Sequence, residues 1–297
     1  MGDNGRANGG TGSAPRSTDR VEVREGVVFH EVDGRALRCD VYEPPDSTRN
    51  GAGVLLLHGG SWQGGDRTQL RGYAILLGRE GYVCVASEYR LLPEHGWPAQ
   101  IHDAKAALRW MHANAGELGI EPSRIAVEGN SAGGHLALLL AGTVGMPEVA
   151  GDAHPDASDE VAAVIAVYPP TVLTFRATSS TTDGGQQMMA SFGDGDTGRR
   201  NAELASPVTH AKPGFPPTLL IHGTADSIVP HRSSQIMFDA LRAHEVPVDL
   251  HLLAGQPHAF DVQPAFGRLC AAEMLLFLDR YLPARQGDRG SLTATTV

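Results

Sequence analysis

Short apolar segments and amphipathic segments alternate along most of the chain. Continuous runs of Val, Ile, Leu and Ala predict buried strands at 53–57, 82–87, 124–128, 161–167, 218–221 and 248–253. Between them, apolar positions at helical spacing predict helices at 99–115, 131–142, 232–244 and 265–281. This alternation predicts an α/β fold, with a mostly parallel central sheet of about eight strands and helices on both of its faces.

Two segments depart from this alternation. Near the start, the apolar runs 27–32 and 37–42 flank Asp33-Gly34, a strong turn dipeptide, and predict an antiparallel hairpin. Residues 171–200 are rich in Thr, Ser, Gly and Asp, with only a few apolar side chains. Because so long a loop within a compact domain is usually a lid or disordered, we expect a small lid insertion there.

Composition and charge narrow the classes of function. The 297 residues include 24 Lys+Arg against 34 Asp+Glu, a formal net charge of −10. An acidic chain without a basic run is a poor candidate for binding nucleic acid, since neutralisation of phosphates dominates that affinity. No apolar run approaches the roughly 18 residues of a membrane span, and the N-terminal residues lack the apolar core of a signal peptide.

The cysteines indicate a compartment. Cys39, Cys84 and Cys270 are widely spaced and lie in apolar or strand-like surroundings. We interpret them as buried thiols in a reducing compartment, because their spacing suits neither a disulfide framework nor a metal cluster. These features together predict a soluble cytoplasmic protein, either a monomer or a homodimer.

A serine nucleophile is predicted at Gly129-Asn130-Ser131-Ala132-Gly133. This G-x-S-x-G motif lies directly between a predicted strand and a predicted helix, as a nucleophile elbow requires. Glycines at its ends allow the tight turn, because a Cβ atom there would collide with the neighbouring strand or helix. A generic strand–turn–helix junction is the alternative interpretation.

A candidate oxyanion hole follows another predicted strand, at His58-Gly59-Gly60-Ser61-Trp62. Tetrahedral intermediates of acyl transfer need N–H donors, and paired glycines leave the backbone free to turn its N–H groups inward. We expect Gly59 and Gly60 to act there together with the N–H group of Ala132. The alternative is a glycine turn beside a core tryptophan.

The serine needs a base and an orienting acid, and chain order suggests both. His258 follows the last predicted strand, whereas His251 lies within that strand and is expected to pack. Asp226 follows the penultimate strand, although it could also be a turn or helix-capping residue. The order Ser131, Asp226, His258 is that of α/β-hydrolases. We interpret His222 and His58 as structural hydrogen-bonding residues.

Competing motifs are weak. Residues 193–198 satisfy G-x-G-x-x-G, but no strand precedes them and their aspartates would repel a pyrophosphate. The sequence contains no phosphate-binding loop, no H-E-x-x-H motif and no Cys/His ligand spacing. We therefore expect neither a cofactor nor a metal.

Several blocks together resemble the α/β-hydrolase serine esterases, specifically the hormone-sensitive-lipase-like carboxylesterases. The matching blocks are HGGSW, SEYRLLPEHGWPAQIHD, RIAVEGNSAGGHLAL, HGTADSIVP and HAFD. The resemblance implies an α/β-hydrolase catalytic domain at 21–283, and we expect a disordered tail at 1–20 and a flexible tail at 284–297. It also implies Ser131 as nucleophile, His258 as base and Asp226 as orienting acid. Ser61 and Asn130 depart from the pattern, and D-S-I-V-P resembles feruloyl-esterase-like and peptidase-like branches.

The expected activity is hydrolysis of carboxylic esters with small to medium acyl groups. We expect Trp62, Met188, Phe192 and Phe260 to form an apolar substrate pocket, with water and a small-molecule ester as the reactants. An amidase, such as an arylformamidase or a short-peptide hydrolase, is the alternative. A third possibility is a binding protein that keeps the fold without turnover.

Overall fold

The computed structural model describes residues 20–173 and 183–283. Its first two strands, β1 (Glu22–Val32) and β2 (Arg35–Glu43), pair antiparallel. Asp33 and Gly34 form the turn between them, both with positive φ, a conformation that glycine adopts without strain. The predicted hairpin is therefore confirmed, with longer strands than the apolar runs alone indicated.

An eight-stranded sheet forms the centre of the molecule, in the order β1-β2-β4-β3-β5-β6-β7-β8. The strands after the hairpin are β3 (Gly53–Leu57), β4 (Val83–Ser87), β5 (Ile125–Asn130), β6 (Ala163–Val167), β7 (Thr218–Gly223) and β8 (Val248–Leu253). β2 pairs antiparallel with β4, and every pairing from β4 to β8 is parallel. This confirms the expected mostly parallel sheet with an antiparallel start.

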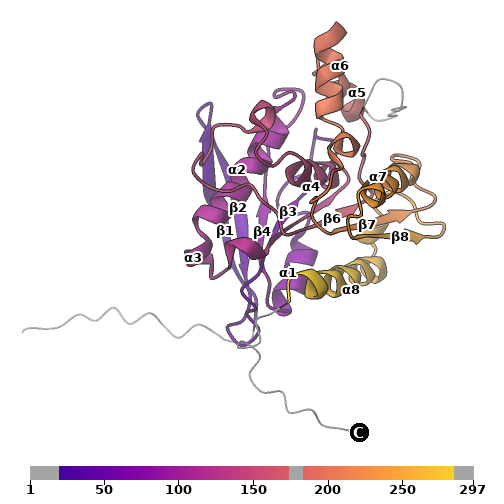
Figure 1. Ribbon diagram of the computed structural model, residues 1–297. Coiled ribbons are helices and arrows are strands. Elements are labelled where there is room, and N and C mark those ends of the chain that lie inside the picture. The colour runs from indigo at the N-terminus through magenta and orange to yellow at the C-terminus, as the bar shows by residue number, and fades with distance from the viewer. Residues whose placement is uncertain (1–19, 174–182, 284–297) are drawn as a thin grey trace, which may run out of the picture.

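Helices cover both faces of this sheet (Figure 1). They are α1 (Arg71–Arg79), α2 (Ala99–Ala113), α3 (Ala115–Leu118), α4 (Ala132–Gly142), α5 (Asp183–Ala190), α6 (Gly195–Leu204), α7 (Arg232–Ala243) and α8 (Pro264–Tyr281). Short 3₁₀ turns lie at η1 (Pro122–Arg124), η2 (Pro147–Val149), η3 (Pro207–His210) and η4 (Phe260–Val262). α1 and α8 lie together on one face, whereas α2, α4 and α7 pack on the other.

Two cores explain why the strands are apolar on both faces. Leu55 and Leu57 of β3 belong to the core beneath α2 and α4. Val54 and Leu56 of the same strand belong to the core beneath α1 and α8. Successive side chains of a strand point to opposite faces, so a strand covered on both sides is apolar throughout. Helix α1 was not predicted, and with nine residues it is the shortest of the five helices that cover the sheet.

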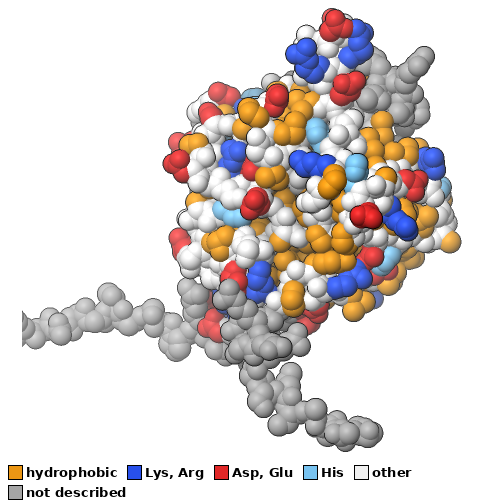
Figure 2. Space-filling model, viewed as in Figure 1, with side chains coloured by type: hydrophobic (Ala, Val, Ile, Leu, Met, Phe, Trp, Pro, Cys, Tyr) orange, Lys and Arg blue, Asp and Glu red, His pale blue; other side chains and the backbone are white. Residues whose placement is uncertain are grey.

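The described part of the expected lid insertion is largely helical. Residues 171–173 and 183–200 of this stretch are described, and they include α5 and the start of α6, which stand at the upper end of the molecule in Figure 1. The α5 residue Gly184 packs against the carbonyl of Ser61, and the Oγ of Ser191 accepts a hydrogen bond of 3.0 Å from the N–H of Trp97. Helix α6 carries charged side chains at the tip of the molecule (Figure 2).

Several other predictions concern composition. The three cysteine thiols are free and buried, as expected from their apolar surroundings. None of the helices within 20–173 and 183–283 is long and apolar enough to cross a membrane. The predicted tails, 1–20 and 284–297, lie outside the described residues except for Arg20.

Candidate active site

Ser131 occupies a sharp turn between β5 and α4. Its φ of 54° and ψ of −116° are strained for a residue with a side chain. A Cβ atom on Gly133 would collide with the carbonyl of Leu57, and one on Gly129 would collide with the backbone of Gly133. The N–H of Ser131 donates to the carbonyl of Val167, 2.8 Å away, which ties the turn to β6. The motif therefore forms the geometry of a nucleophile elbow.

Three side chains from separate strand ends meet at this turn. His258 Nε2 lies 3.0 Å from the Oγ of Ser131, and His258 Nδ1 lies 2.6 Å from Oδ2 of Asp226. The other oxygen of Asp226 accepts hydrogen bonds from the N–H groups of Ile228 and Val229, at 2.9 and 2.8 Å. Asp226 thus holds Nδ1 as the protonated nitrogen, and Nε2 can accept the proton of the serine hydroxyl.

His222 supports the carboxylate from the other side. Its Nε2 lies 3.2 Å from Oδ2 of Asp226 and 2.9 Å from the carbonyl of Val229, so this nitrogen must carry the proton. The hydroxyl of Ser234 then donates to His222 Nδ1, 2.7 Å away. Burial raises the pKa of Asp226, but the hydrogen bonds from His222, His258 and the Val229 backbone outweigh it and hold this pKa below its usual value.

The candidate oxyanion donors surround the same serine. The Cα of Gly59 approaches the Ser131 turn so closely that a Cβ there would lie 3.1 Å from the carbonyl oxygen of Asn130. Gly60 has a φ of 115°, and its carbonyl accepts the N–H groups that close the next turn. Ala132 is the first residue of α4, where unpaired N–H groups and the helix dipole favour an anion. These positions agree with an oxyanion site.

A cavity of about 760 Å³ opens beside Ser131 and His258. Gly59, Gly60 and Asn130 also line it. Its wall away from the serine is mainly apolar and comes from the segment around α1, the loop after β7 and the segment leading into α8. The apolar side chains are those of Leu70, Ile75, Leu76, Ile228, Val262 and Pro264. Ser131 and His258 therefore lie at the edge of a mainly apolar surface.

The structure does not bring the four expected substrate-binding side chains to this cavity. Trp62, Met188, Phe192 and Phe260 are all buried, with at most 4% of their surface exposed, and none lines it. Trp62 packs edge-on against His135, while Phe192 packs against Trp97 and Phe260 against Phe266. Large apolar residues near a site are often core residues, and sequence alone does not tell which side of a loop faces the cavity.

Residues that sequence reasoning missed include Tyr73, Tyr168 and Asp261, which line the cavity. Tyr168 follows β6, so its position at a strand end was a signal that could have found it. His58, interpreted as structural, is buried and stacks on Tyr89. His251 was expected to pack, but its side chain is partly exposed and pairs with Glu273.

Fold and site together define the class of protein. The carboxyl ends of the parallel strands carry the serine turn, the glycine loop, the aspartate and the histidine, in the chain order typical of the class. This is the arrangement of the α/β-hydrolases.

The chain belongs to the BD-FAE family, whose sequence profile matches residues 39–241. It is 32% identical over 292 residues to the probable carboxylic ester hydrolase LipM of Mycobacterium tuberculosis, covering 93% of this chain. It is also 32% identical over 240 residues to esterase LipC of the same organism, covering 77% of this chain. The chain spans 66% of the length of LipM and 58% of that of LipC.

Solved structures show the same fold. The thermophilic esterase Est2 of Thermogutta terrifontis superposes with a TM-score of 0.74 at 26% identity, covering 91% of this chain and 96% of Est2. The form of that esterase phosphonylated by sarin also gives a TM-score of 0.74 at 26% identity, covering 90% of this chain and 97% of that one. The resemblance to hormone-sensitive-lipase-like and feruloyl-esterase-like carboxylesterases is therefore confirmed.

Proposed function

We propose that this protein hydrolyses carboxylic esters through an acyl-enzyme on Ser131. The observation that carries the proposal is the continuous relay from Asp226 through His258 to the hydroxyl of Ser131, with contacts of 2.6 and 3.0 Å, at the wall of an apolar cavity. The relatives named as esterases support it, and so does the organophosphate-modified esterase of the same fold.

Each proposed step follows from the contacts. The Oγ of Ser131 attacks the ester carbonyl carbon while Nε2 of His258 accepts the hydroxyl proton. The oxyanion accepts hydrogen bonds from the N–H groups of Gly59, Gly60 and Ala132. Collapse of this intermediate breaks the ester bond, and His258 gives its proton to the departing alkoxide, which releases the alcohol. Water then gives a proton to His258 as it attacks the acyl carbon. Collapse of this second intermediate releases the carboxylic acid, and His258 returns the proton to the Oγ of Ser131.

The cavity favours small to medium acyl groups. Apolar side chains make up most of the wall away from the serine, and burial of apolar substrate surface favours binding. The Thermogutta terrifontis esterase has been solved with bound propionate and with bound butyrate, which supports short acyl chains as substrates for this fold. We propose that acyl groups of this size are the substrates of this chain as well.

Three coarser properties belong to the same proposal. We propose that 21–283 form one catalytic domain, since the two cores and the site all lie within these residues. The buried free thiols support a reducing compartment such as the cytoplasm. A monomer or a homodimer is the proposed state in solution, and light scattering would measure it.

Ser131→Ala tests the proposal. We expect turnover of p-nitrophenyl esters, measured from acetate to octanoate, to fall by at least about 10⁴-fold, because the nucleophile is lost. The control is Ser158→Ala, which removes an exposed hydroxyl that accepts a hydrogen bond from the N–H of Glu160. This control should keep full turnover and full labelling by a fluorophosphonate probe. Equal turnover by wild type and Ser131→Ala would refute the proposal, whereas faster cleavage of a matched amide than of its ester would indicate an amidase.

A further inference from the structure

A single carboxylate in the cavity wall joins three segments of the chain. Asp261 lies in η4, three residues after His258. Its Oδ2 accepts hydrogen bonds from the hydroxyl of Tyr73 in α1 and from the amide of Asn130, both at 2.8 Å. Its Oδ1 accepts a hydrogen bond of 2.6 Å from the hydroxyl of Tyr168. The loop that carries the base is therefore tied to α1 and to the ends of β5 and β6.

The hydrogens that these partners carry allow only one pattern of hydrogen bonds around Asp261. Each tyrosine has one hydroxyl hydrogen, and both hydrogens point to Asp261. Asn130 has two amide hydrogens: one points to Asp261 and the other to the hydroxyl oxygen of Tyr168, 3.0 Å away. Burial raises the pKa of both Tyr73 and Tyr168, and the charge of Asp261 raises it further, so both hydroxyls remain donors. Asp261, Tyr168 and Asn130 thus form a closed ring of hydrogen bonds.

Two of the three donors adjoin the reacting groups. Asn130 immediately precedes Ser131 in the chain. The ring of Tyr168 packs against the ring of His258, with centroids 4.5 Å apart and planes tilted by 56°. Both Ser131 and Tyr168 have strained backbones, with φ values of 54° and 41°, and such conformations persist only where their surroundings hold them.

We propose that Asp261 is a positioning residue, whose carboxylate sets the alignment of His258 with Ser131 by holding Tyr168 and Asn130. The proposal rests on the proposed function, because alignment matters only if these two side chains exchange a proton. Asp261 acts through Tyr168 and Asn130, so its loss should affect the chemical step more than substrate binding. Small misalignments of reacting groups are costly in rate.

Asp261→Ala, compared with Asp279→Ala, tests the proposal. Asp279 accepts a hydrogen bond of 2.9 Å from the buried hydroxyl of Tyr82, so it offers a matched Tyr–Asp pair whose residues do not line the cavity. We expect kcat of Asp261→Ala to fall about 10- to 100-fold, with KM changed less than about threefold. Asp279→Ala should lose thermal stability yet keep kcat within about twofold of wild type. Rates are compared for protein whose circular dichroism shows the native fold.

Two tyrosine variants separate positioning from general stability. Tyr168→Phe keeps the ring against His258 but removes the hydroxyl, and we expect a kcat several-fold below that of wild type. Tyr82→Phe makes the same change in the Tyr82–Asp279 pair, which does not line the cavity, and its kcat should stay near that of wild type. If Asp261→Ala does not fold, Tyr168→Phe decides the question by the same measurement.

The outcomes also distinguish this proposal from the proposed function. A folded Asp261→Ala with wild-type kcat would overturn the positioning role, as would an equal loss of kcat in Asp279→Ala. Full turnover by Ser131→Ala would overturn both proposals together. An inactive Ser131→Ala beside a fully active Asp261→Ala would overturn only the positioning role.

Discussion

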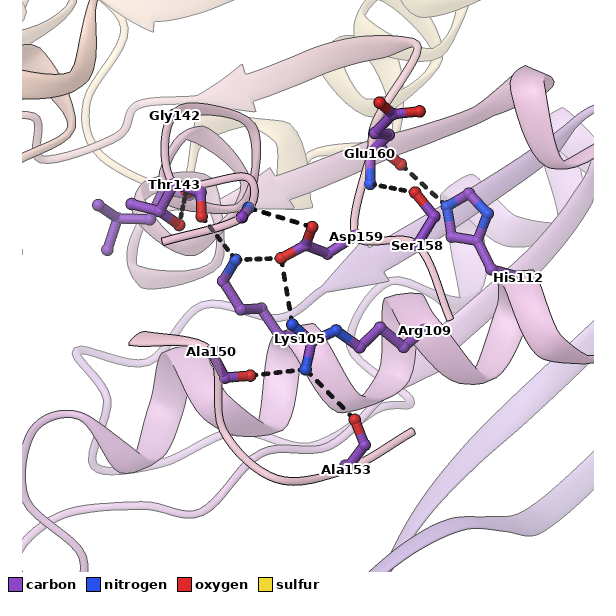
Figure 3. A network of polar contacts seen from close by, with 12 residues as sticks. Lys105, Arg109, His112, Gly142, Thr143, Ala150, Ala153, Ser158, Asp159 and Glu160 are labelled. Atoms are coloured by element: carbon purple, nitrogen blue, oxygen red, sulfur yellow. Dashed lines mark hydrogen bonds and ion pairs between the residues drawn. The ribbon is translucent and has the colours of Figure 1, made fainter. Parts of the chain in front are cut away.

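Two aspartates, Asp226 and Asp159, are equally buried but have different partners. Asp226 and Asp159 each expose 7% of their surface, and each accepts several hydrogen bonds. Asp226 contacts His258, which lines the cavity together with Ser131. Asp159 lies in the segment between α4 and β6, where it faces two cations of α2 (Figure 3).

The partners of Asp159 are all held within the protein. Lys105, whose side chain is fully buried, has its Nζ 2.5 Å from Asp159 and 2.8 Å from the carbonyl of Thr143. Arg109 contacts Asp159 at 3.3 Å and also donates to the carbonyls of Ala150 and Ala153 (Figure 3). This network fastens the segment before β6 onto α2, because Asp159 and the carbonyls of three residues hold the two cations in place.

The two aspartates differ in what else their side-chain partners contact. His258 gives one nitrogen to Asp226 and presents the other to Ser131 at the cavity. Lys105 and Arg109 direct their donors to carbonyls and to Asp159. A buried carboxylate thus serves chemistry only where a titratable partner also faces a cavity, and elsewhere it fixes the fold.

The largest expected effect is a loss of kcat on substitution of Asp226. In Asp226→Asn, the side-chain amide can donate a hydrogen to His258 Nδ1, which moves the imidazole proton to Nε2. His258 then cannot accept the proton of Ser131, and we expect kcat for a p-nitrophenyl ester to fall by about 10⁴-fold. Steady-state kinetics on the folded variant measures this.

Asp159→Asn is the matched control, because the same exchange is made at equal burial. We expect its kcat to stay within about twofold of wild type, since none of its partners lines the cavity. A similar loss of kcat in both variants would contradict the division of roles between the two aspartates.

The second-largest effect is expected on the free energy of unfolding, from a substitution of Asp159. Asp159→Ala leaves Lys105 buried without its counter-charge, and we expect the free energy of unfolding to fall by about 3–5 kcal/mol. Urea denaturation followed by circular dichroism measures it. A triple variant, Lys105→Met and Arg109→Leu with Asp159→Leu, removes all three charges and should recover much of this stability, because apolar replacements of buried ion pairs and triads are often neutral. If the single variant unfolds at the wild-type urea concentration, the network adds nothing to stability.

Much of the fold was predictable because the strands and the longer helices carry local signals. The continuous runs at β3 and β8 give both strands with the bounds that we predicted. The proposed nucleophile, base and acid share this property, since each lies in the loop that follows a strand and the carboxyl ends of parallel strands meet at one edge. Chain order alone thus predicted that Ser131, Asp226 and His258 would come together.

The lining of the cavity was not predictable in the same way. Phe192 and Met188 belong to an insertion whose direction depends on tertiary packing, and both side chains turn into the core. The actual lining includes Leu76 of α1, a helix of only nine residues that was not predicted. Asp261 follows His258 closely, but its three donors come from positions 73, 130 and 168, and no local pattern links them.

Glu128 extends the comparison to a buried carboxyl group without partners, and it gives the smallest and most gradual effect. It is fully buried in β5, and neither of its oxygens has a hydrogen-bond partner among the described residues. Burial raises the pKa of Glu128 well above the ordinary 4.5, and the charge of Asp261 raises it further. By contrast, the hydrogen-bond donors around Asp226 hold the pKa of that carboxyl group below the ordinary 3.8. The two groups must therefore affect stability in opposite directions as the pH changes.

The sign follows from proton uptake. Above about pH 4.5 the unfolded chain releases the proton of Glu128 while the folded chain keeps it, so rising pH favours unfolding by up to about tenfold per pH unit. Asp226 instead stabilises the fold above its ordinary pKa, and this contribution is lost as the pH falls towards its lowered value in the fold. Glu128→Gln removes the first effect and leaves the second. Its stability relative to wild type, measured by urea denaturation at half-unit steps from pH 5 to pH 8, should therefore increase steadily with pH. Parallel curves for the two proteins would mean that Glu128 ionises in the fold as readily as in the unfolded chain, and that burial without partners does not by itself hold a carboxyl group neutral here.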